Sequence, residues 1–341
     1  METEVLEQRL PDTRDSGLMY SIAAVLFIFV GGLLADAGLP DYLYVVLSEV
    51  LIIALPPILL AKARHLSIRQ TFRLKMPRPV EVLLTLMIGP VMLIAATCAG
   101  LVALILIRNA FGSLLISDGV TPLMSKGIFW SVFLVGVVPA VCEELLFRGF
   151  IQRGLERMGV GWAIFLSGLL FGLFHFDFQR FAAQTLIGLV SAYMVYRTGS
   201  IFCGMLLHFM NNGLITLITY YSLKGIEGTD LAQQMADPFE SSEFAEIAEQ
   251  YGMSVPEFLN SLILPAIIIF IVCLVVIFGL LVAVRNVTAE KVKLPVRNEK
   301  AAGGLLLGIP GLVLVLLVYT AIGLMLAGNP AGTAILRLLG L

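Results

Sequence analysis

The chain has 341 residues, of which 59% are hydrophobic and only 13% are charged, with a formal net charge of −2. Soluble domains carry roughly 25% charged residues, so this composition excludes a soluble globular protein and indicates a chain that lies in a lipid bilayer. The near-neutral charge gives no reason to expect a nucleic-acid partner.

Nine apolar runs are long enough to cross a hydrocarbon core about 30 Å thick. In chain order they cover about 17–37, 42–61, 80–107, 127–147, 160–177, 180–196, 201–222, 260–284 and 304–327. The sequence therefore predicts an all-α, polytopic transmembrane helical bundle of about eight to nine spans. The first run follows a polar segment of mixed charge and has no small-residue cleavage site behind it, so we expect an uncleaved helix there.

The basic residues predict the sidedness of the spans, because Lys and Arg collect on the cytoplasmic side of a membrane. With the N-terminus inside, 17 of the 22 basic residues fall in cytoplasmic segments, six of them in the loop 62–78. We therefore expect a cytoplasmic N-terminus. The basic loop follows from this topology, and anionic lipid headgroups are its natural counter-ions.

The spans divide the chain into four segments. Residues 1–126 hold spans 1–3, 127–222 hold spans 4–7, 223–259 form a polar insertion, and 260–341 hold spans 8–9. The insertion carries one Lys and eight acids and falls on the outer side. Its Asp-Pro-Phe-Glu stretch at 237–240 is typical of a helix N-terminus and predicts a short amphipathic surface helix, with a solvated acidic loop as the alternative.

The fourth run ends in VCEELLFRG, residues 141–149, which places two acids and an arginine within an apolar helix. On a helix Glu144 and Arg148 stand at i and i+4 and can form an ion pair. Glu143 points about 100° away and is left free. Pro139 removes a backbone hydrogen bond and clashes with the carbonyl of Val135, so we expect a bend just before the acids.

Two further runs carry histidines on polar faces. FGLFH puts Phe171 and His175 at i and i+4, on a span whose Gly168 and Gly172 allow close helix approach. HFMNN puts His208 and Asn212 on one face in the same way. Ionisable groups at membrane depth cost several kcal/mol and by default indicate function. One such His or Asn could equally join helices, but three polar faces close in sequence favour a site.

These residue types suit the attack of an activated water. Glu143 would take a proton from the water, and neutral His or Asn donors would stabilise the oxyanion. Alternatively, Glu143, His175 and His208 could ligate Zn²⁺ with water in the fourth position.

The three motifs resemble the CPBP family of intramembrane endopeptidases, which includes type II CAAX prenyl proteases and bacterial bacteriocin-processing and self-immunity proteins. The family pattern is Glu-Glu-x-x-x-Arg, Phe-x-x-x-His and His-x-x-x-Asn. It is matched in order by Glu143, Glu144 and Arg148, by Phe171 and His175, and by His208 and Asn212. The resemblance covers roughly residues 127–222, under a third of the chain.

The resemblance implies an intramembrane protease in the bacterial inner membrane that cleaves a membrane-embedded protein or peptide. It implies that Glu143 is the general base, that His175, His208 and Asn212 complete the catalytic site, and that Glu144, Arg148 and Phe171 support it. The family has been described both as metal-dependent and as metal-free.

We favour a site without a cofactor and keep zinc as the alternative. The sequence has no His-Glu-x-x-His helix, and Asn212 is placed to donate rather than to coordinate. Zinc would also need outer acceptors for both imidazoles, whereas Glu144 already has Arg148 as a partner. Two other classes remain open from sequence: a transporter with charges at mid-depth, and a catalytically silent immunity or binding protein.

The depths of the three motifs set one further expectation. At 1.5 Å per residue, Glu143 and His208 lie about 8 and 12 Å from the inner surface, but His175 lies about 20 Å from it. A common site then needs a tilted or displaced fifth span, or a preceding helix that continues through residues 148–158. We expect the continuous helix.

Overall fold

The computed structural model describes residues 9–112, 114, 121–224, 242–291 and 299–341. Within these residues the chain is helical and contains no strand, which confirms the predicted all-α bundle. The helices of the first half are α1 Thr13–Val25, α2 Gly31–Asp36, α3 Asp41–Leu47, α4 Leu55–Ala63, α5 Ile68–Thr71, α6 Pro79–Phe111, α7 Thr121–Met124, α8 Ile128–Ser131, α9 Val138–Glu144 and α10 Gln152–Leu155. Those of the second half are α11 Val160–Leu173, α12 Phe178–Thr198, α13 Ile201–Lys224, α15 Ser242–Gln250, α16 Val255–Val287, α17 Ile309–Leu326 and α18 Pro330–Leu339.

Several helices join end to end through π-helical turns and form longer continuous helices. These turns cover Leu26–Val30, Ser48–Ala54, Val132–Val137 and Leu145–Ile151. Short 3₁₀ segments cover Glu156–Met158, Ala289–Lys291 and Glu299–Gly308. Each π turn admits one extra residue and re-aims the side chains that follow it, and such turns are frequent at functional sites.

Seven helices among the described residues are long and apolar enough to cross a membrane: Thr13–Asp36, Asp41–Ala63, Pro79–Phe111, Ile128–Met158, Ile201–Ser222, Val255–Val287 and Ala302–Leu326. They match seven of the nine apolar runs. The other two runs correspond to α11, which has only 14 residues, and to α12, whose first turns carry Gln179, Arg180 and Gln184. α11 and α12 follow each other in the chain. If neither crosses the membrane, the number of crossings before α13 falls by two, so α13 still begins on the same side of the membrane.

The helix Ile128–Met158 continues through residues 148–158, as expected from the depths of the motifs. The amphipathic helix expected in the insertion is present as α15, which buries Ala248 and packs Phe244 against Phe258 of α16, with ring centroids 5.5 Å apart. Its expected N-terminal motif at 237–240 lies outside the described residues.

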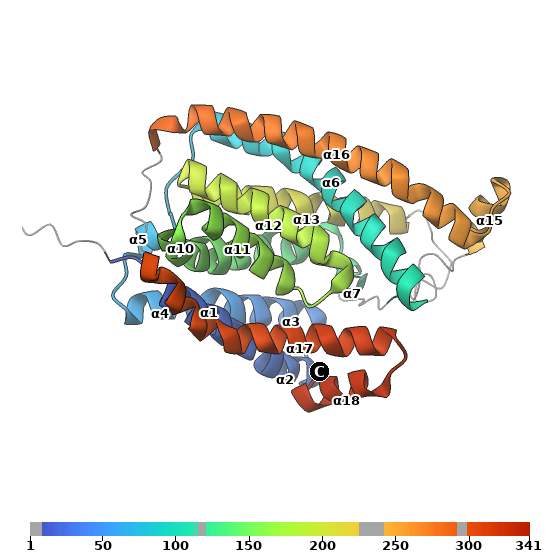
Figure 1. Cartoon of the computed structure of the whole chain (residues 1–341), viewed down its shortest axis with the longest axis horizontal. Helices are drawn as coiled ribbons and strands as arrows, with labels where there is room; N and C mark the ends of the chain where they lie inside the picture. Colours follow the sequence, from blue (N-terminus) through green and yellow to red (C-terminus); the bar gives the residue numbers. More distant parts are fainter. Residues whose placement is uncertain (1–8, 113, 115–120, 225–241, 292–298) are drawn as a thin grey trace, which may run out of the picture.

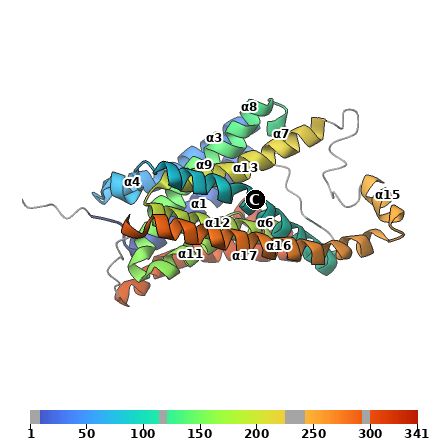
Figure 2. The ribbon, with the colours of Figure 1, turned by 90° about the horizontal axis from the view of Figure 1, so that it is seen from above.

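The motif-bearing helices lie in the middle of the bundle. Figure 1 shows α11, α12 and α13 between two flanking layers, with α6 and α16 along one edge and α1, α17 and α18 along the other. The view from above in Figure 2 again places α16 beside α6. The flanking layers therefore enclose the helices that carry the polar motifs.

Candidate active site

The two acids sit on a helix with irregular turns on both sides. α9 carries Glu143 and Glu144, and it lies between the π-helical turns Val132–Val137 and Leu145–Ile151. Pro139 near its start leaves the Val135 carbonyl without its helical donor. Asn212 of α13 supplies a replacement, because its Nδ2 donates to Val135 O at 3.3 Å. The third motif is thus bonded, through Asn212, to the carbonyl that Pro139 frees.

Glu144 is fully buried and paired through both of its carboxylate oxygens. Oε1 forms an ion pair with Arg148 Nη1 at 2.8 Å, and both side chains are 0% exposed. Oε2 accepts a hydrogen bond of 2.9 Å from Ser191 Oγ on α12. The Arg148 guanidinium also lies 4.2 Å from the centroid of the Phe171 ring, which adds a cation–π contact. The structure therefore brings these three predicted supporting residues, Glu144, Arg148 and Phe171, into one closed cluster.

Glu143 faces the two predicted histidines and lacks such partners. Its Oε2 lies 4.0 Å from His175 Nε2 and 3.9 Å from His208 Nε2. Both gaps exceed a direct hydrogen bond and suit a bridging water. This oxygen has no hydrogen-bond partner among the described residues. The Glu143 and His175 side chains are 16% and 20% exposed, whereas His208 is 2% exposed and Glu143 Oε2 itself is buried.

His175 is oriented by the helix that precedes it. Its Nδ1 donates to the carbonyl of Phe171 at 2.9 Å, so Nε2 carries the free lone pair that faces Glu143. His175 lies in a short turn, residues 174–177, which we call the His175 turn. Phe176 in this turn has a φ of +51°, a left-handed conformation that a bulky residue adopts only when its surroundings hold it there.

Aromatic rings from both ends of the chain hold the His175 turn. Phe27 of the first transmembrane helix stacks on Phe176, with ring centroids 5.3 Å apart. Tyr319 of α17 packs edge to face on Phe178, immediately after the turn, at 4.8 Å. Its hydroxyl also points to the carbonyl of Asp177 at 3.5 Å. The helices that flank the motif region therefore contribute to the placement of His175.

His208 and Asn212 act as a unit on α13. Asn212 Nδ2 donates to His208 Nε2 at 3.2 Å, so the imidazole proton resides on Nδ1, which faces Glu144 Oε1 at 3.4 Å. Asn211 Nδ2 donates in turn to Asn212 Oδ1 at 3.1 Å. All four predicted catalytic residues, Glu143, His175, His208 and Asn212, thus lie around one point.

Glycines let the motif helices approach this closely. A Cβ on Gly168 would meet the backbone of α12 at Leu189, 2.8 Å away, and one on Gly172 would meet Thr185, which confirms the small-residue face expected on α11. On α13, a Cβ at Gly204 would collide with Glu144 Oε2 and with Val195. The buried ion pair therefore depends on the absence of a side chain at Gly204.

Glu49 is a further acid that the three motifs do not include. It lies in the π-helical turn Ser48–Ala54, which packs against α9. Its Oε2 is buried without a hydrogen-bond partner among the described residues. The sequence already marks Glu49, because it is an acid inside the apolar run 42–61 and ionisable groups at membrane depth usually indicate function.

Within the described parts of the chain, no three His, Cys, Asp or Glu side chains are grouped as metal ligands, and Asn212 occupies the Nε2 lone pair of His208 that zinc would need. One sequence expectation fails here. Glu144 faces His208 as well as Arg148. Its carboxylate therefore remains an acceptor for the imidazole of His208 although it is also paired with the arginine.

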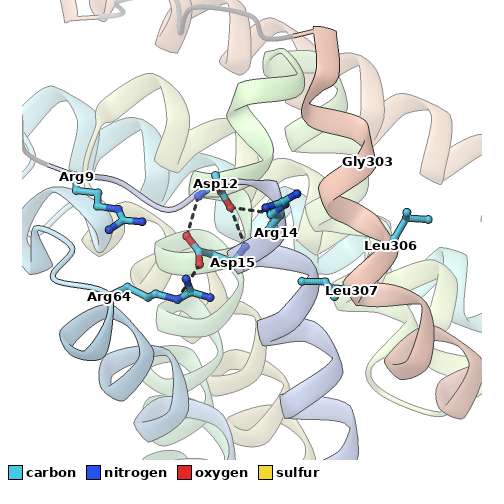
Figure 3. Close-up of a pocket in the computed structure, with 8 residues that line it drawn as sticks. All are labelled: Arg9, Asp12, Arg14, Asp15, Arg64, Gly303, Leu306 and Leu307. Atoms are coloured by element: carbon cyan, nitrogen blue, oxygen red, sulfur yellow. Dashed lines mark hydrogen bonds and ion pairs between the residues drawn. The ribbon is translucent and has the colours of Figure 1, made fainter.

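A separate hollow of about 480 Å³ lies between the start of α1 and the segment before α17, and none of the site residues above lines it. Figure 3 shows its charged lining already engaged in capping and pairing: Asp12 accepts from the backbone of Arg14 and Asp15, and Arg64 reaches Asp15. These contacts fix the first turn of α1 and bring no acid–base pair comparable to Glu143 and His175.

A family model described as Type II CAAX prenyl endopeptidase Rce1-like matches residues 125–214. The match spans all three motifs, covers about a quarter of the chain, and confirms the resemblance found from the motifs. No curated protein and no solved structure matches the chain. Residues 125–214 are therefore similar to a type II CAAX prenyl endopeptidase domain, and the described residues around them include seven helices long and apolar enough to cross a membrane.

Proposed function

We propose that this protein is an intramembrane endopeptidase that hydrolyses a peptide bond of a membrane-associated protein or peptide, with water activated by Glu143. The observation that carries the proposal is the contrast on α9. Glu144 is buried and forms an ion pair with Arg148 at 2.8 Å, whereas Glu143 Oε2 has two imidazole nitrogens as its nearest ion-pair partners, at 3.9 and 4.0 Å. A base needs this freedom, because it must take up a proton during the reaction.

The tautomers of the two histidines define their proposed roles. The Nε2 lone pair of His175 faces Glu143 and can accept a hydrogen bond from the water, whereas the Nε2 lone pair of His208 already accepts from Asn212. Glu143 removes one proton from the water while an imidazole holds the other, and the water oxygen then bonds to the peptide carbonyl carbon. Asn212 is an amide donor on the same helix face as His208, and to stabilise the developing oxyanion it would release Val135 O or His208 Nε2. Sequence reasoning left this donor role open between His and Asn.

We further propose that residues 127–222 form the catalytic core, with 1–126 and 260–341 as its scaffold and the N-terminus in the cytoplasm. Phe27 and Tyr319 support this division, because they hold the His175 turn from opposite ends of the chain. The acidic insertion 223–259 takes no part in the proposed chemistry.

The test uses purified protein in nanodiscs and two kinds of peptide, a prenylated C-a-a-X peptide and a panel of unprenylated membrane-spanning peptides, with products identified by mass spectrometry. Glu143→Gln should lower the cleavage rate by about 10²–10⁴-fold, the usual contribution of a general base. Glu246→Gln, on the surface helix α15, is the matched control and should cleave normally. Solute flux that depends on Glu143, without any cleavage, would indicate a transporter instead.

The proposed mechanism requires no metal, and elemental analysis of the active enzyme tests this directly. Activity should persist in a chelator. One zinc per chain, with activity lost to the chelator and restored by Zn²⁺, would overturn the metal-free mechanism.

A further inference from the structure

The hollow of about 480 Å³ at the start of α1 lies among charged side chains that the proposed protease chemistry does not use. Its volume falls within the range of about 300–1,000 Å³ that is usual for small-molecule sites. Arg9, Arg14 and Arg64 line it together with Asp12 and Asp15. The charged groups therefore gather around a space large enough to hold a ligand.

The two acids in this lining are already compensated by the protein. Asp12 Oδ1 caps α1 by accepting from the backbone N–H groups of Arg14 and Asp15 at 2.9 and 3.0 Å. Asp15 Oδ2 accepts from the backbone N–H of Asp12 at 3.1 Å, and its Oδ1 lies 3.6 Å from Arg64 Nε. The start of the helix and one arginine thus offset both negative charges, which leaves the other two arginines without an acid.

The guanidinium groups of Arg9 and Arg14 are exposed and free. Within the part of the chain that the structure describes, neither side chain has an ion pair or a hydrogen bond. In Figure 3 the bond drawn to Arg14 ends on its backbone, and none reaches Arg9. Two unneutralised arginines beside a hollow favour an anionic ligand, and arginine binds phosphate groups through paired, charge-assisted hydrogen bonds.

Another wall of the hollow is apolar and held in place by α1. Leu306 and Leu307 line this wall with 65% and 46% of their surface exposed, and they belong to the helix Ala302–Leu326, which is long enough to cross a membrane. The Ser21 hydroxyl donates to Leu307 O at 2.6 Å and accepts from Gly311 N at 3.0 Å. Exposed leucines beside free arginines suit a lipid, which joins a charged headgroup to apolar chains, better than they suit a free phosphate ion.

The hollow also lies at the end of the bundle where anionic headgroups are expected. Figure 1 shows the start of α1, the end of α4 and the segment before α17 at the same end of the molecule. The distribution of basic residues predicts that this end faces the cytoplasm. The cytoplasmic leaflet carries the anionic lipids that attract basic segments.

We propose that the hollow binds the headgroup of one anionic phospholipid, with Arg9 and Arg14 on its phosphate and its acyl chains along Leu306 and Leu307. The proposal does not depend on the proposed protease function. A single site of this kind holds one lipid per chain. It therefore differs from the general attraction of basic loops to anionic membranes, which has no fixed stoichiometry and involves exposed basic residues outside the hollow equally.

The test uses the purified full chain in an uncharged detergent and counts bound lipids by native mass spectrometry during titration with phosphatidylglycerol. The wild type should bind one phosphatidylglycerol per chain in preference to phosphatidylcholine. The double variant Arg9→Gln with Arg14→Gln should weaken this binding by about 30-fold, the effect expected of two basic residues at a lipid surface. The matched control Lys62→Gln with Arg69→Gln removes two exposed charges outside the hollow and should bind as the wild type does.

Thermal unfolding without lipid checks the fold, and both double variants should unfold as the wild type does, because the substituted side chains are exposed. If the first double variant is unstable, the single variants Arg9→Gln and Arg14→Gln replace it, and each should weaken binding by about fivefold. Equal losses in the two double variants, or equal binding of the two lipids, would overturn the proposal. Inorganic phosphate that stabilises the wild type as much as phosphatidylglycerol does would identify a free phosphate site and overturn it too.

Discussion

Glu143 and Glu144 are neighbours in the chain but lie in two different regions of the molecule. The Glu144 region is closed: Arg148, Ser191 and the ring of Phe171 surround groups with no exposed surface. The Glu143 region is open, with partly exposed side chains and an oxygen that no described residue satisfies. We infer that the Glu144 region serves stability and that the Glu143 region leaves polar groups available to a substrate. The two acids are consecutive residues of α9.

The comparison shows how a membrane protein can keep a reactive acid without losing its fold. In the closed region the charge of Glu144 has an arginine 2.8 Å away, whereas among the described residues the nearest ion-pair partners of Glu143 are imidazole nitrogens at 3.9 and 4.0 Å. Substitutions in the two regions should therefore change different properties. Stability should respond in the closed region, and turnover in the open one.

The largest effect on stability should come from Arg148→Ala. It leaves the Glu144 carboxylate buried without its cation, which costs about 3–5 kcal/mol for buried pairs. Thermal and denaturant unfolding in detergent measure the loss. The double variant Glu144→Gln with Arg148→Met removes both charges and should recover most of it. Full stability with lost activity in Arg148→Ala would instead give the arginine a direct part in the chemistry.

Gly204→Ala should destabilise the closed region by about 1–3 kcal/mol, the usual cost of overpacking. The new Cβ would collide with the Glu144 carboxylate and with Val195. The control is Gly279→Ala on α16, where a Cβ meets nothing within 4 Å, and it should be neutral or slightly stabilising. Equal unfolding curves for the two variants would contradict the close approach of α13 to Glu144.

Ser191→Ala should have a smaller effect, about 0.6 kcal/mol, which is the average for hydrogen bonds between membrane helices. It removes the donor to Glu144 Oε2 but leaves the ion pair intact. Ser261→Ala, at an exposed serine that bonds only to the backbone of its own helix, serves as the matched control. A loss as large as that of Arg148→Ala would mean that the hydroxyl, rather than the guanidinium, holds the carboxylate.

The smallest change in stability should follow Glu143→Gln, because within the described parts of the chain its nearest ion-pair partners lie 3.9 and 4.0 Å away and a neutral amide would lose little. The unfolding temperature should stay within error of the wild type while cleavage is lost. The same substitution at Glu144 should lower the unfolding temperature clearly. If both variants were equally destabilised, the distinction between an open and a closed region would not hold.

Much of this arrangement could be predicted from sequence, because it depends on local spacing. The i and i+4 pairs of Glu144 with Arg148 and of His208 with Asn212 follow from helix geometry. The Val135 carbonyl freed by Pro139 was also foreseeable, but its acceptance of Asn212 was not, since it joins residues 77 positions apart.

Other features depend on contacts that spacing does not encode. The π-helical turns leave no clear trace in an apolar run, so the irregular turn Ser48–Ala54 that packs against α9 could not be predicted. The hairpin of α11 and α12 resembles two further spans, because its residues are apolar through burial in protein as well as in lipid. The aromatic contacts of Phe27 and Tyr319 with the His175 turn join distant parts of the chain, and no local pattern reveals them.

The dependence of the His175 turn on Tyr319 has a consequence for biosynthesis. Tyr319 leaves the ribosome more than a hundred residues after Asn212, which is a delay of roughly 5–20 s at about 5–20 residues per second. During that interval all three motifs are already made, but α17 is not yet available to pack against Phe178. The motif helices are therefore made before the last aromatic contact of the His175 turn can form. We expect the site to be fully assembled for catalysis only after the C-terminal helices are in place.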